Sequence, residues 1–300
     1  MSTTVRTTST AERTAAPRRN RRKTVATVVY STTAVVVGLI MAFPVYWMVN
    51  TSFLPPTMIR GAVPNFFAGS DATLQNYERA IFGEGRAPFL PALTNSLLTS
   101  LITVVGAILI GFLAALAVSR FKFFGRHTFI IAILIVQMLP GAALLWTYYQ
   151  IIDGWGLTNN IIGLSLLLIC ASLPFTIWTM RGFVLTVPPD LEESAMVDGC
   201  TRAGAFWRIT FPLLAPGLVS TGIFSFITSW NTFTLALVIM NRPESMTLPV
   251  WLRTFQQLNR GTDWGALMAG STLVALPVMI FFLIVQSRMT GGLVAGAVKG

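Results

Sequence analysis

Six long apolar stretches, separated by polar segments, organise the chain. None contains Asp, Glu, Lys, Arg or His, and each is 21 to 28 residues long. A membrane-spanning helix needs about 20 mainly apolar residues, whereas transmembrane strands alternate in polarity over about 10 residues. The pattern therefore predicts an all-α polytopic membrane protein with six transmembrane helices, at Val25–Val49, Thr94–Val118, Thr128–Gln150, Asn160–Met180, Leu213–Met240 and Gly265–Gln286. Prolines inside four of these stretches indicate kinks, at Pro44, Pro140, Pro174 and Pro277.

The composition favours the same fold class. Hydrophobic residues make up 54% of the 300 residues and charged residues only 11%, against about 25% charged residues in soluble domains. So few charges cannot cover the surface of a soluble domain, which excludes an ordinary cytosolic enzyme. The high hydrophobicity also excludes a wholly disordered chain.

The formal net charge of +10 is unevenly distributed between the two sides of the predicted membrane. If the N-terminus is cytoplasmic, the cytoplasmic segments hold 15 of the 21 Lys and Arg residues and the outer segments hold 6. Such an excess on one side is typical of cytoplasmic loops, so both termini are predicted to be cytoplasmic. The basic run Arg18–Lys23 adjoins the first span and is interpreted as a topology anchor rather than as a nucleic-acid site.

These features divide the chain into five segments. The first span is interpreted as a retained helix, because its 25 apolar residues exceed the 7–15 that a cleaved signal peptide uses. The predicted segments are a disordered basic cytoplasmic tail (1–24), the first transmembrane helix (25–49), an extracytoplasmic loop (50–93), a core of five spans with a cytoplasmic loop at 181–212 (94–288), and a cytoplasmic C-terminal tail (289–300).

The cytoplasmic loop 181–212 carries the clearest local signals. Pro188 and Pro189 suit the first turn of a helix, and the acids that follow them suit its N-terminal dipole. Gly199 is placed to end that helix, and Thr201 is placed to cap a second one. The loop is therefore predicted to form two short helices whose exposed side presents small and acidic residues to a partner.

The residues Glu193-Ser194-Ala195-x-x-Asp198-Gly199, followed by Phe206, Ile209 and Pro212, resemble the EAA loop of ABC importer permeases. The departures are Ser194 for the first Ala and Cys200 for the usual Ala after Gly, and both are small. The resemblance implies a type I ABC importer transmembrane domain, whose permease core is 94–288 and whose loop docks on a cytoplasmic ATPase. It assigns that docking to Glu192, Glu193, Ser194, Ala195, Asp198 and Gly199.

Other stretches resemble carbohydrate permeases, in particular the maltose-type second permease subunit. These are Asn95-Ser96-Leu97, Ser229-Trp230-Asn231-x-Phe233, Thr247-Leu248-Pro249, Trp264–Gly270 and Gly296–Gly300. The resemblance implies a heterodimer with a similar permease, two ATPase subunits that hold ATP and Mg, an extracytoplasmic sugar-binding protein, and the bacterial inner membrane. It implies that the binding protein touches the outer loop at Thr247, Leu248 and Pro249.

The energy for transport is predicted to come from a separate subunit. The only Lys followed by Ser or Thr is Lys23, and no glycine-rich loop precedes it, so a phosphate-binding P-loop is missing. An ion-coupled carrier, which is one alternative, usually has an ionisable residue in the membrane, and the predicted spans have none. A membrane enzyme is a second alternative, but no catalytic residue or metal site suggests itself from one His and two Cys.

The solute pathway is predicted from the neutral polar and aromatic side chains within the spans. Sugars are neutral and rich in hydroxyl groups, so the candidates are Gln137, Ser229, Trp230 and Asn231. Such side chains also make hydrogen bonds between helices, and that alternative stays open here. The specific solute is not predicted, and a glycerophosphate-type solute is an alternative to a di- or oligosaccharide.

Overall fold

The computed structural model describes residues 21–61, 63–83, 87–257 and 261–297. Most of the predicted N-terminal tail (1–20) and the last three residues of the predicted C-terminal tail therefore lie outside the described residues. Residues 21–24 and 289–297 belong to helices, α1 and α13 respectively. The chain divides into two compact units, residues 1–47 and 48–300, which are described separately.

The first unit contains most of helix α1 (Arg21–Phe53). From Ala26 to Trp47 its apolar residues lie on every face rather than along one stripe, the pattern of a helix that lipid or other apolar helices surround. Pro44 lies inside α1 without ending it. The aromatic rings of Phe43 and Trp47, one turn apart, stack at 6.1 Å.

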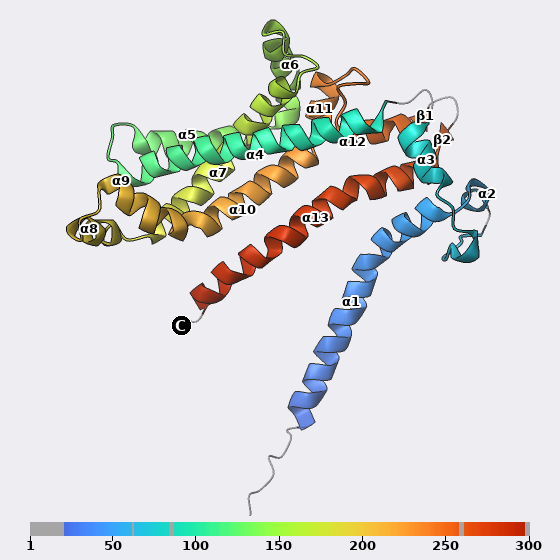
Figure 1. Ribbon diagram of the computed structural model, residues 1–300, viewed down its shortest axis with the longest axis horizontal. Helices are drawn as coiled ribbons and strands as arrows, with labels where there is room; N and C mark the ends of the chain where they lie inside the picture. The colour runs from blue at the N-terminus through green and yellow to red at the C-terminus, as the bar shows by residue number, and fades with distance from the viewer. Residues whose placement is uncertain (1–20, 62, 84–86, 258–260, 298–300) are drawn as a thin grey trace, which may run out of the picture. The chain divides into compact units, whose positions relative to one another are not determined.

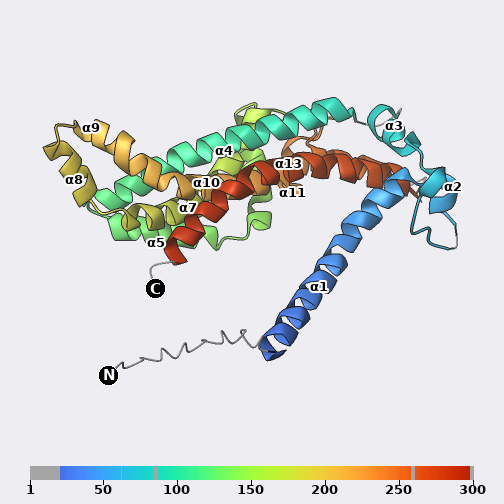
Figure 2. The same ribbon diagram turned by 60° about the horizontal axis from the view of Figure 1, so that its bottom comes forward.

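The second unit is mainly helical in its described part (Figures 1 and 2). After the end of α1, its helices are α2 (Pro56–Ile59), α3 (Gln75–Phe82), α4 (Phe89–Arg120), α5 (Arg126–Gln137), α6 (Leu145–Gly154), α7 (Ile161–Thr186), α8 (Asp190–Val197), α9 (Arg202–Ala205), α10 (Phe211–Trp230), α11 (Thr234–Ile239), α12 (Leu248–Leu252) and α13 (Trp264–Ala297). Two short strands, β1 (Gln256–Gln257) and β2 (Gly261–Thr262), pair antiparallel. Short 3₁₀ turns η1 (Gly69–Asp71), η2 (Gly141–Leu144) and η4 (Arg253–Phe255) and one π-helical turn, η3 (Phe206–Thr210), complete the described elements.

Helices α4, α7 and α10 pack against one another and form the centre of this unit (Figure 1). Glycines allow close approach: the Cα of Gly111 faces Thr176, and that of Gly217 faces the ring of Phe183. Helices in a membrane associate through such small residues, because lipid provides no hydrophobic driving force between them. Helix α5 packs on α7, and α13 packs on α10 and α3.

Replacing Gly163 by Ala is expected to destabilise this bundle. A Cβ at Gly163 in α7 would lie 2.3 Å from the carbonyl oxygen of Leu157, a backbone atom that cannot move aside, so overpacking should cost about 2 kcal/mol of unfolding free energy. Gly182, in the same helix, has no atom within 4 Å of such a Cβ. Gly182→Ala should therefore be neutral or stabilising by up to about 1 kcal/mol. Thermal unfolding of both variants in detergent compares them, and equal transition temperatures would contradict the packing argument.

Five helices are long and apolar enough to cross a membrane among the described residues, and a sixth span results if one bent pair is counted as a single span. The predicted all-α membrane fold is therefore confirmed, and two of the six predicted spans differ in the structure. The first is the predicted span Thr128–Gln150, which breaks between α5 and α6 into halves bent by 88°. Pro140 lacks a backbone donor and disfavours helical geometry at the residue before it, so the sequence indicated a kink there but not so large a bend.

The second difference lies in the predicted span Leu213–Met240. Helical structure begins earlier, at Arg202, and continues through η3 into α10. It ends at Trp230, and the short α11 follows after a turn. The turn is closed by the side-chain amide of Asn231, which donates to the carbonyl of Ile227 at 2.9 Å. Short polar side chains that bond to nearby backbone groups compete with helix continuation in this way.

Buried apolar clusters occupy the two ends of the bundle and position the segments that connect its helices. At one end, Phe112, Met180 and Leu214 join α4, α7 and α10 directly beside α8 and α9. At the other end, Trp251 and Phe255 pack with Phe89 and Trp230. The α8–α9 pair and the 239–248 connection therefore lie against buried apolar clusters at opposite ends of α10.

Candidate functional site

Helix α8 and the short α9 form the helix pair that the sequence predicts. Proline residues precede α8, Asp190 opens it, and Gly199 follows it with φ of +92°. The amide of Cys200 donates to the carbonyl of Ala195 at 3.0 Å, so the last turn of α8 is closed by a glycine in the left-handed region. The Thr201 hydroxyl accepts from the amide of Gly204 at 3.1 Å and caps α9. The predicted roles of the prolines before α8, of Gly199 after it and of Thr201 as the cap of α9 are thus confirmed.

Glu192 fastens α8 to the two long helices beside it. Its Oε1 lies 3.3 Å from Nη2 of Arg120, the last residue of α4, and accepts a 2.6 Å hydrogen bond from the Thr210 hydroxyl at the start of α10. The same Arg120 nitrogen donates to the carbonyl of Val187, just before α8. The Arg120 and Glu192 side chains are only 22% and 19% exposed. Glu192, assigned by resemblance to the docking surface, therefore lies turned towards its own chain.

The other predicted docking residues divide by exposure. Glu193, Ser194, Asp198 and Gly199 are exposed, whereas Ala195 is buried on the inner side of α8. Two apolar side chains that the resemblance did not assign stand beside them, Met196 and Val197, of which Val197 is 88% exposed. The outer face of α8 therefore combines carboxylates with apolar surface.

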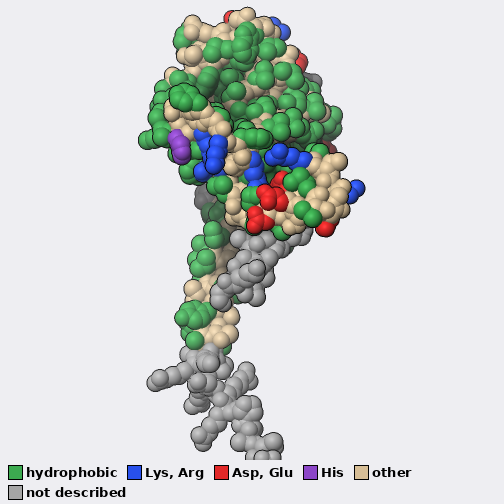
Figure 3. Space-filling model, turned by 90° about the vertical axis from the view of Figure 1, so that its left-hand side faces the viewer, with side chains coloured by type: hydrophobic (Ala, Val, Ile, Leu, Met, Phe, Trp, Pro, Cys, Tyr) green, Lys and Arg blue, Asp and Glu red, His purple; other side chains and the backbone are tan. Residues whose placement is uncertain are grey.

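A groove runs between the α8–α9 pair and the end of α4, with a volume of about 650 Å³. The exposed Trp207 and the partly buried Phe206 give it aromatic walls. Arginines 120 and 202 and glutamates 192 and 193 give it charges of both signs. Figure 3 looks at this end of the molecule, where acidic side chains gather beside Lys and Arg side chains. A groove with charges of both signs, beside a helix that exposes carboxylates and apolar side chains, has the mixed composition of protein–protein interfaces.

The predicted pathway residues lie in two places. Gln137 is exposed at the last position of α5, whereas Ser229, Trp230 and Asn231 follow one another at the end of α10. Trp230 is 1% exposed and stacks on Phe226 at 5.5 Å. The Ser229 hydroxyl donates to that of Thr103 at 3.5 Å. In this conformation Ser229 and Trp230 are packed inside the chain, and their role in the pathway stays a prediction.

The outer-loop motif is mostly buried. Thr247 and Leu248 are 3% and 0% exposed, and Pro249 is partly buried. The backbone amide of Leu248 donates to the Ser96 hydroxyl at 2.7 Å. In this conformation the first two side chains cannot meet a partner. The exposed part of the same loop precedes the motif, at positions 241–244, which we call the tip.

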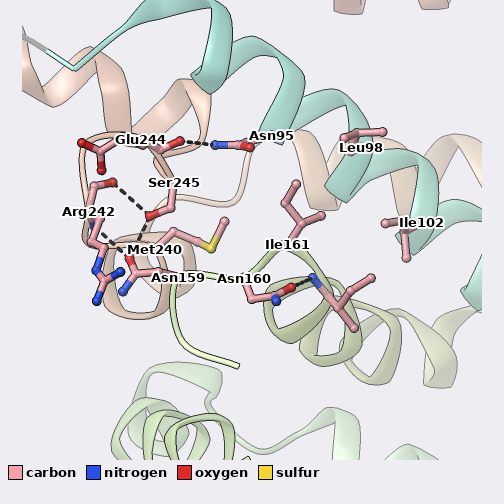
Figure 4. Close-up of a pocket in the computed structure, with 11 residues that line it drawn as sticks. Asn95, Leu98, Ile102, Asn159, Asn160, Ile161, Met240, Arg242, Glu244 and Ser245 are labelled. Atoms are coloured by element: carbon pink, nitrogen blue, oxygen red, sulfur yellow. Dashed lines mark hydrogen bonds between the residues drawn. The ribbon is translucent and has the colours of Figure 1, made fainter. Parts of the chain in front are cut away.

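A second cavity, of about 610 Å³, adjoins the tip (Figure 4). Asparagine side chains and a Met–Ile–Leu wall surround it, and its lining residues are Asn95, Leu98, Ile102, Asn159, Asn160, Ile161, Ile162, Met240, Arg242, Glu244 and Ser245. Sequence reasoning missed Asn159. It also missed Arg120 and Thr210, whose side chains hold Glu192 and which we call the clamp on Glu192. All three act through residues that are distant in the chain. The signal that could have found them is their position, because polar side chains gather at helix ends and in loop turns.

Long apolar helices and a centre of three closely packed helices define a multi-pass membrane protein, which presents the short helices α8 and α9 at one end. Residues 107–290 match the family described as binding-protein-dependent transport system inner membrane component, so the chain belongs to that family. It is a permease subunit of the ABC importer type, and it is not an enzyme. The EAA-type resemblance predicted this class correctly.

Several curated relatives match nearly the whole chain. The diacetylchitobiose uptake system permease protein DasC of Streptomyces coelicolor is 44% identical over 268 residues, which is 89% of this chain and 95% of that protein. The trehalose transport system permease protein SugB of Mycobacterium tuberculosis is 36% identical, over 86% of this chain and 92% of SugB. The trehalose/maltose transport system permease protein MalG of Thermococcus litoralis is 32% identical, over 89% and 95%.

A solved structure has the same fold. It is a bacterial ABC transporter involved in the import of the acidic polysaccharide alginate, and a chain of it superposes with a TM-score of 0.73 at 20% sequence identity. The superposition covers 91% of this chain and 99% of that chain. At this identity the likeness shows the fold alone, and it confirms the predicted all-α fold of an ABC importer permease.

Proposed function

We propose that this chain is the membrane subunit of an ATP-driven importer that carries a di- or oligosaccharide across the bacterial inner membrane. The observation that supports coupling to an ATPase is the exposed α8, with carboxylates at Glu193 and Asp198 and a left-handed Gly199 behind them. The support for a sugar is the identity to relatives named for diacetylchitobiose, trehalose and maltose.

The proposed assembly follows from the family. A second, similar permease completes the pathway, two cytoplasmic ATPase subunits hold ATP and Mg, and an extracytoplasmic binding protein delivers the sugar. In this arrangement the α8 end of the bundle and both chain termini are cytoplasmic, and the tip is outside. The distribution of Lys and Arg supports that orientation.

The clamp on Glu192 suggests how ATPase movement reaches the spans. Closure of the ATPase pair displaces α8, and the ion pair with Arg120 and the hydrogen bond from Thr210 pull on α4 and α10 together. Helices packed as closely as α4, α7 and α10 move as rigid bodies rather than bend gradually. The pathway then alternates between facing inwards and facing outwards.

The substrate is tested by uptake into cells that lack the chromosomal permease and express this chain with its gene neighbours. Labelled diacetylchitobiose, trehalose and maltose are compared with labelled glycerol 3-phosphate. We expect at least one sugar to accumulate at least about tenfold above the strain without the permease, and the phosphate not to accumulate. Accumulation should survive an ionophore that collapses ion gradients and should fail when ATP is depleted. Uptake of the phosphate alone, or uptake abolished by the ionophore with ATP present, would overturn the proposal.

A further inference from the structure

Asn159 has an unusual backbone conformation at the corner between α6 and α7. Its φ is +56°, and among the described residues it is the only non-glycine residue with positive φ. Asparagine adopts this left-handed region several times more readily than most residues. Its backbone amide donates to the carbonyl of Ile239 at 2.9 Å, which joins the corner to the end of α11.

The side chain of Asn159 binds the base of the tip through a single oxygen. Its Oδ1 accepts from the backbone amides of Asn241 and Arg242 at 2.9 and 2.8 Å, and from the hydroxyl of Ser245 at 2.8 Å. Figure 4 shows this oxygen directed into the turn that carries Arg242 and Ser245. All three partners are donors, so the oxygen of the amide must face them.

Helix α4 holds the same loop from the other side. Here the amide nitrogen of an asparagine donates, whereas at Asn159 the amide oxygen accepts. The Nδ2 of Asn95 donates to the carbonyl of Glu244 at 3.0 Å (Figure 4) and to that of Met246 at 3.1 Å. The next residue, Ser96, accepts from the amide of Leu248. The tip is thus fastened to α4 and to the α6–α7 corner, while its own side chains stay exposed, Arg242 and Glu244 among them.

We propose that Asn159 and Asn95 are positioning residues that hold the tip for the solute-binding protein and link its displacement to α7 and α4. This inference rests on the proposed function, because it takes the binding protein as the partner. The exposed tip offers a cation and an anion two residues apart, and rim charges of this kind govern orientation and encounter. Without the two amides the tip would have to be ordered during docking, at a cost in affinity.

The two asparagines allow one chemical change with opposite expected results. Asn159→Asp keeps an oxygen acceptor for three donors and keeps a residue that tolerates positive φ. Asn95→Asp replaces a donor by a carboxylate that faces two carbonyl oxygens. Asn159→Gly adds a third variant, because it permits the backbone conformation and removes the acceptor. Removal of the acceptor or of the donor should loosen the tip, and the Asp variant at 159 should not.

The experiment uses the complete importer in proteoliposomes, with the purified binding protein of the same importer. ATP hydrolysis is measured against binding-protein concentration. For Asn95→Asp and Asn159→Gly we expect the half-saturating concentration to rise about tenfold, with hydrolysis in the absence of binding protein unchanged. Asn159→Asp should stay within about twofold of the wild type. A purely structural role would instead reduce the amount of assembled complex or the basal rate in all variants that lose a bond.

The outcomes separate the inference from the function on which it rests. Unchanged half-saturation in Asn159→Gly and Asn95→Asp, with normal stimulation of the wild type, would overturn the positioning role alone. A wild-type complex that the binding protein does not stimulate would overturn the proposed function. If Asn159→Gly does not assemble, Ser245→Ala, which removes one donor at the partly buried edge of the turn, should still shift half-saturation in the same direction, and no shift would count against the inference.

Discussion

Replacing Glu193 by lysine is expected to abolish uptake while the protein still enters the membrane in normal amounts. Glu193 is exposed on α8, and no hydrogen bond or ion pair is found for its side chain in the described part of the chain. Within the fold this carboxylate only complements the N-terminal dipole of α8, a contribution of about 0.3–1 kcal/mol, so reversing its charge should leave the bundle intact. At a docked interface a like-charge contact costs several kcal/mol, so uptake should fall at least about 100-fold. Labelled sugar uptake, normalised to membrane-bound protein, measures the loss.

Two variants control for this prediction. Glu193→Gln removes the charge without reversing it and should retain a measurable part of the uptake. Glu78→Lys reverses an exposed acid on α3, far along the chain from α8, and should leave uptake close to the wild type. Normal uptake by Glu193→Lys, at equal amounts of protein, would show that this face of α8 does not dock.

Local signals account for most of the α8–α9 pair. Proline before α8, Gly199 after it and Thr201 at the start of α9 each act within a few residues, so the sequence carries them openly. The inward position of Glu192 could not be predicted in this way. Its partner Arg120 is 72 residues earlier in the chain, and one side chain faces inwards and its neighbour outwards only because α4 and α10 lie beneath α8.

The spans illustrate the same limit at larger scale. Apolar length predicted where the helices are, because hydropathy is a property of the segment itself. The size of the bend at Pro140, 88°, is not set by apolar length, and the burial of Trp230 depends on its packing partners. A tryptophan in an apolar run reads equally well as a pathway residue or as a core residue. Trp251 and Phe255 lie in the same cluster as Trp230, and only the folded chain reveals that the cluster covers it.

The corner at Asn159 lies beside the outer loop that the sequence indicated, but its contacts involve residues that the sequence did not single out for this loop. The notable motif there was Thr247-Leu248-Pro249, whose first two side chains are buried. Asn95 and Ser96 were recognised as a motif at the start of a span, and they prove to hold that loop in place. Polar side chains at helix starts bond to whatever backbone lies near them, and the identity of that backbone is a tertiary property.

Removing the Glu192 carboxylate is expected to uncouple ATP hydrolysis from transport. In Glu192→Ala, α8 keeps its exposed face but loses its ties to Arg120 and Thr210. We expect sugar uptake to fall about 10- to 100-fold, while ATP hydrolysis by the assembled complex falls much less. The Arg120 and Glu192 side chains are each about one-fifth exposed, so solvent weakens their ion pair. The variant should therefore lose about 1–2 kcal/mol of unfolding free energy.

A double-mutant cycle distinguishes this clamp from general damage to the fold. Glu192→Gln keeps the shape of its side chain, Arg120→Met keeps only an unbranched apolar stem, and each removes the ion pair. In contacting pairs the combined change usually departs from the sum by about 0.5–3 kcal/mol. We therefore expect the double variant to lose little more transport than either single variant. Thr210→Val removes only the hydroxyl donor to Glu192. It should lower the ratio of sugar transport to ATP hydrolysis in the same direction, by a smaller amount. Additive losses in the cycle, or equal losses of hydrolysis and uptake, would mean that the clamp stabilises the loop without transmitting its movement.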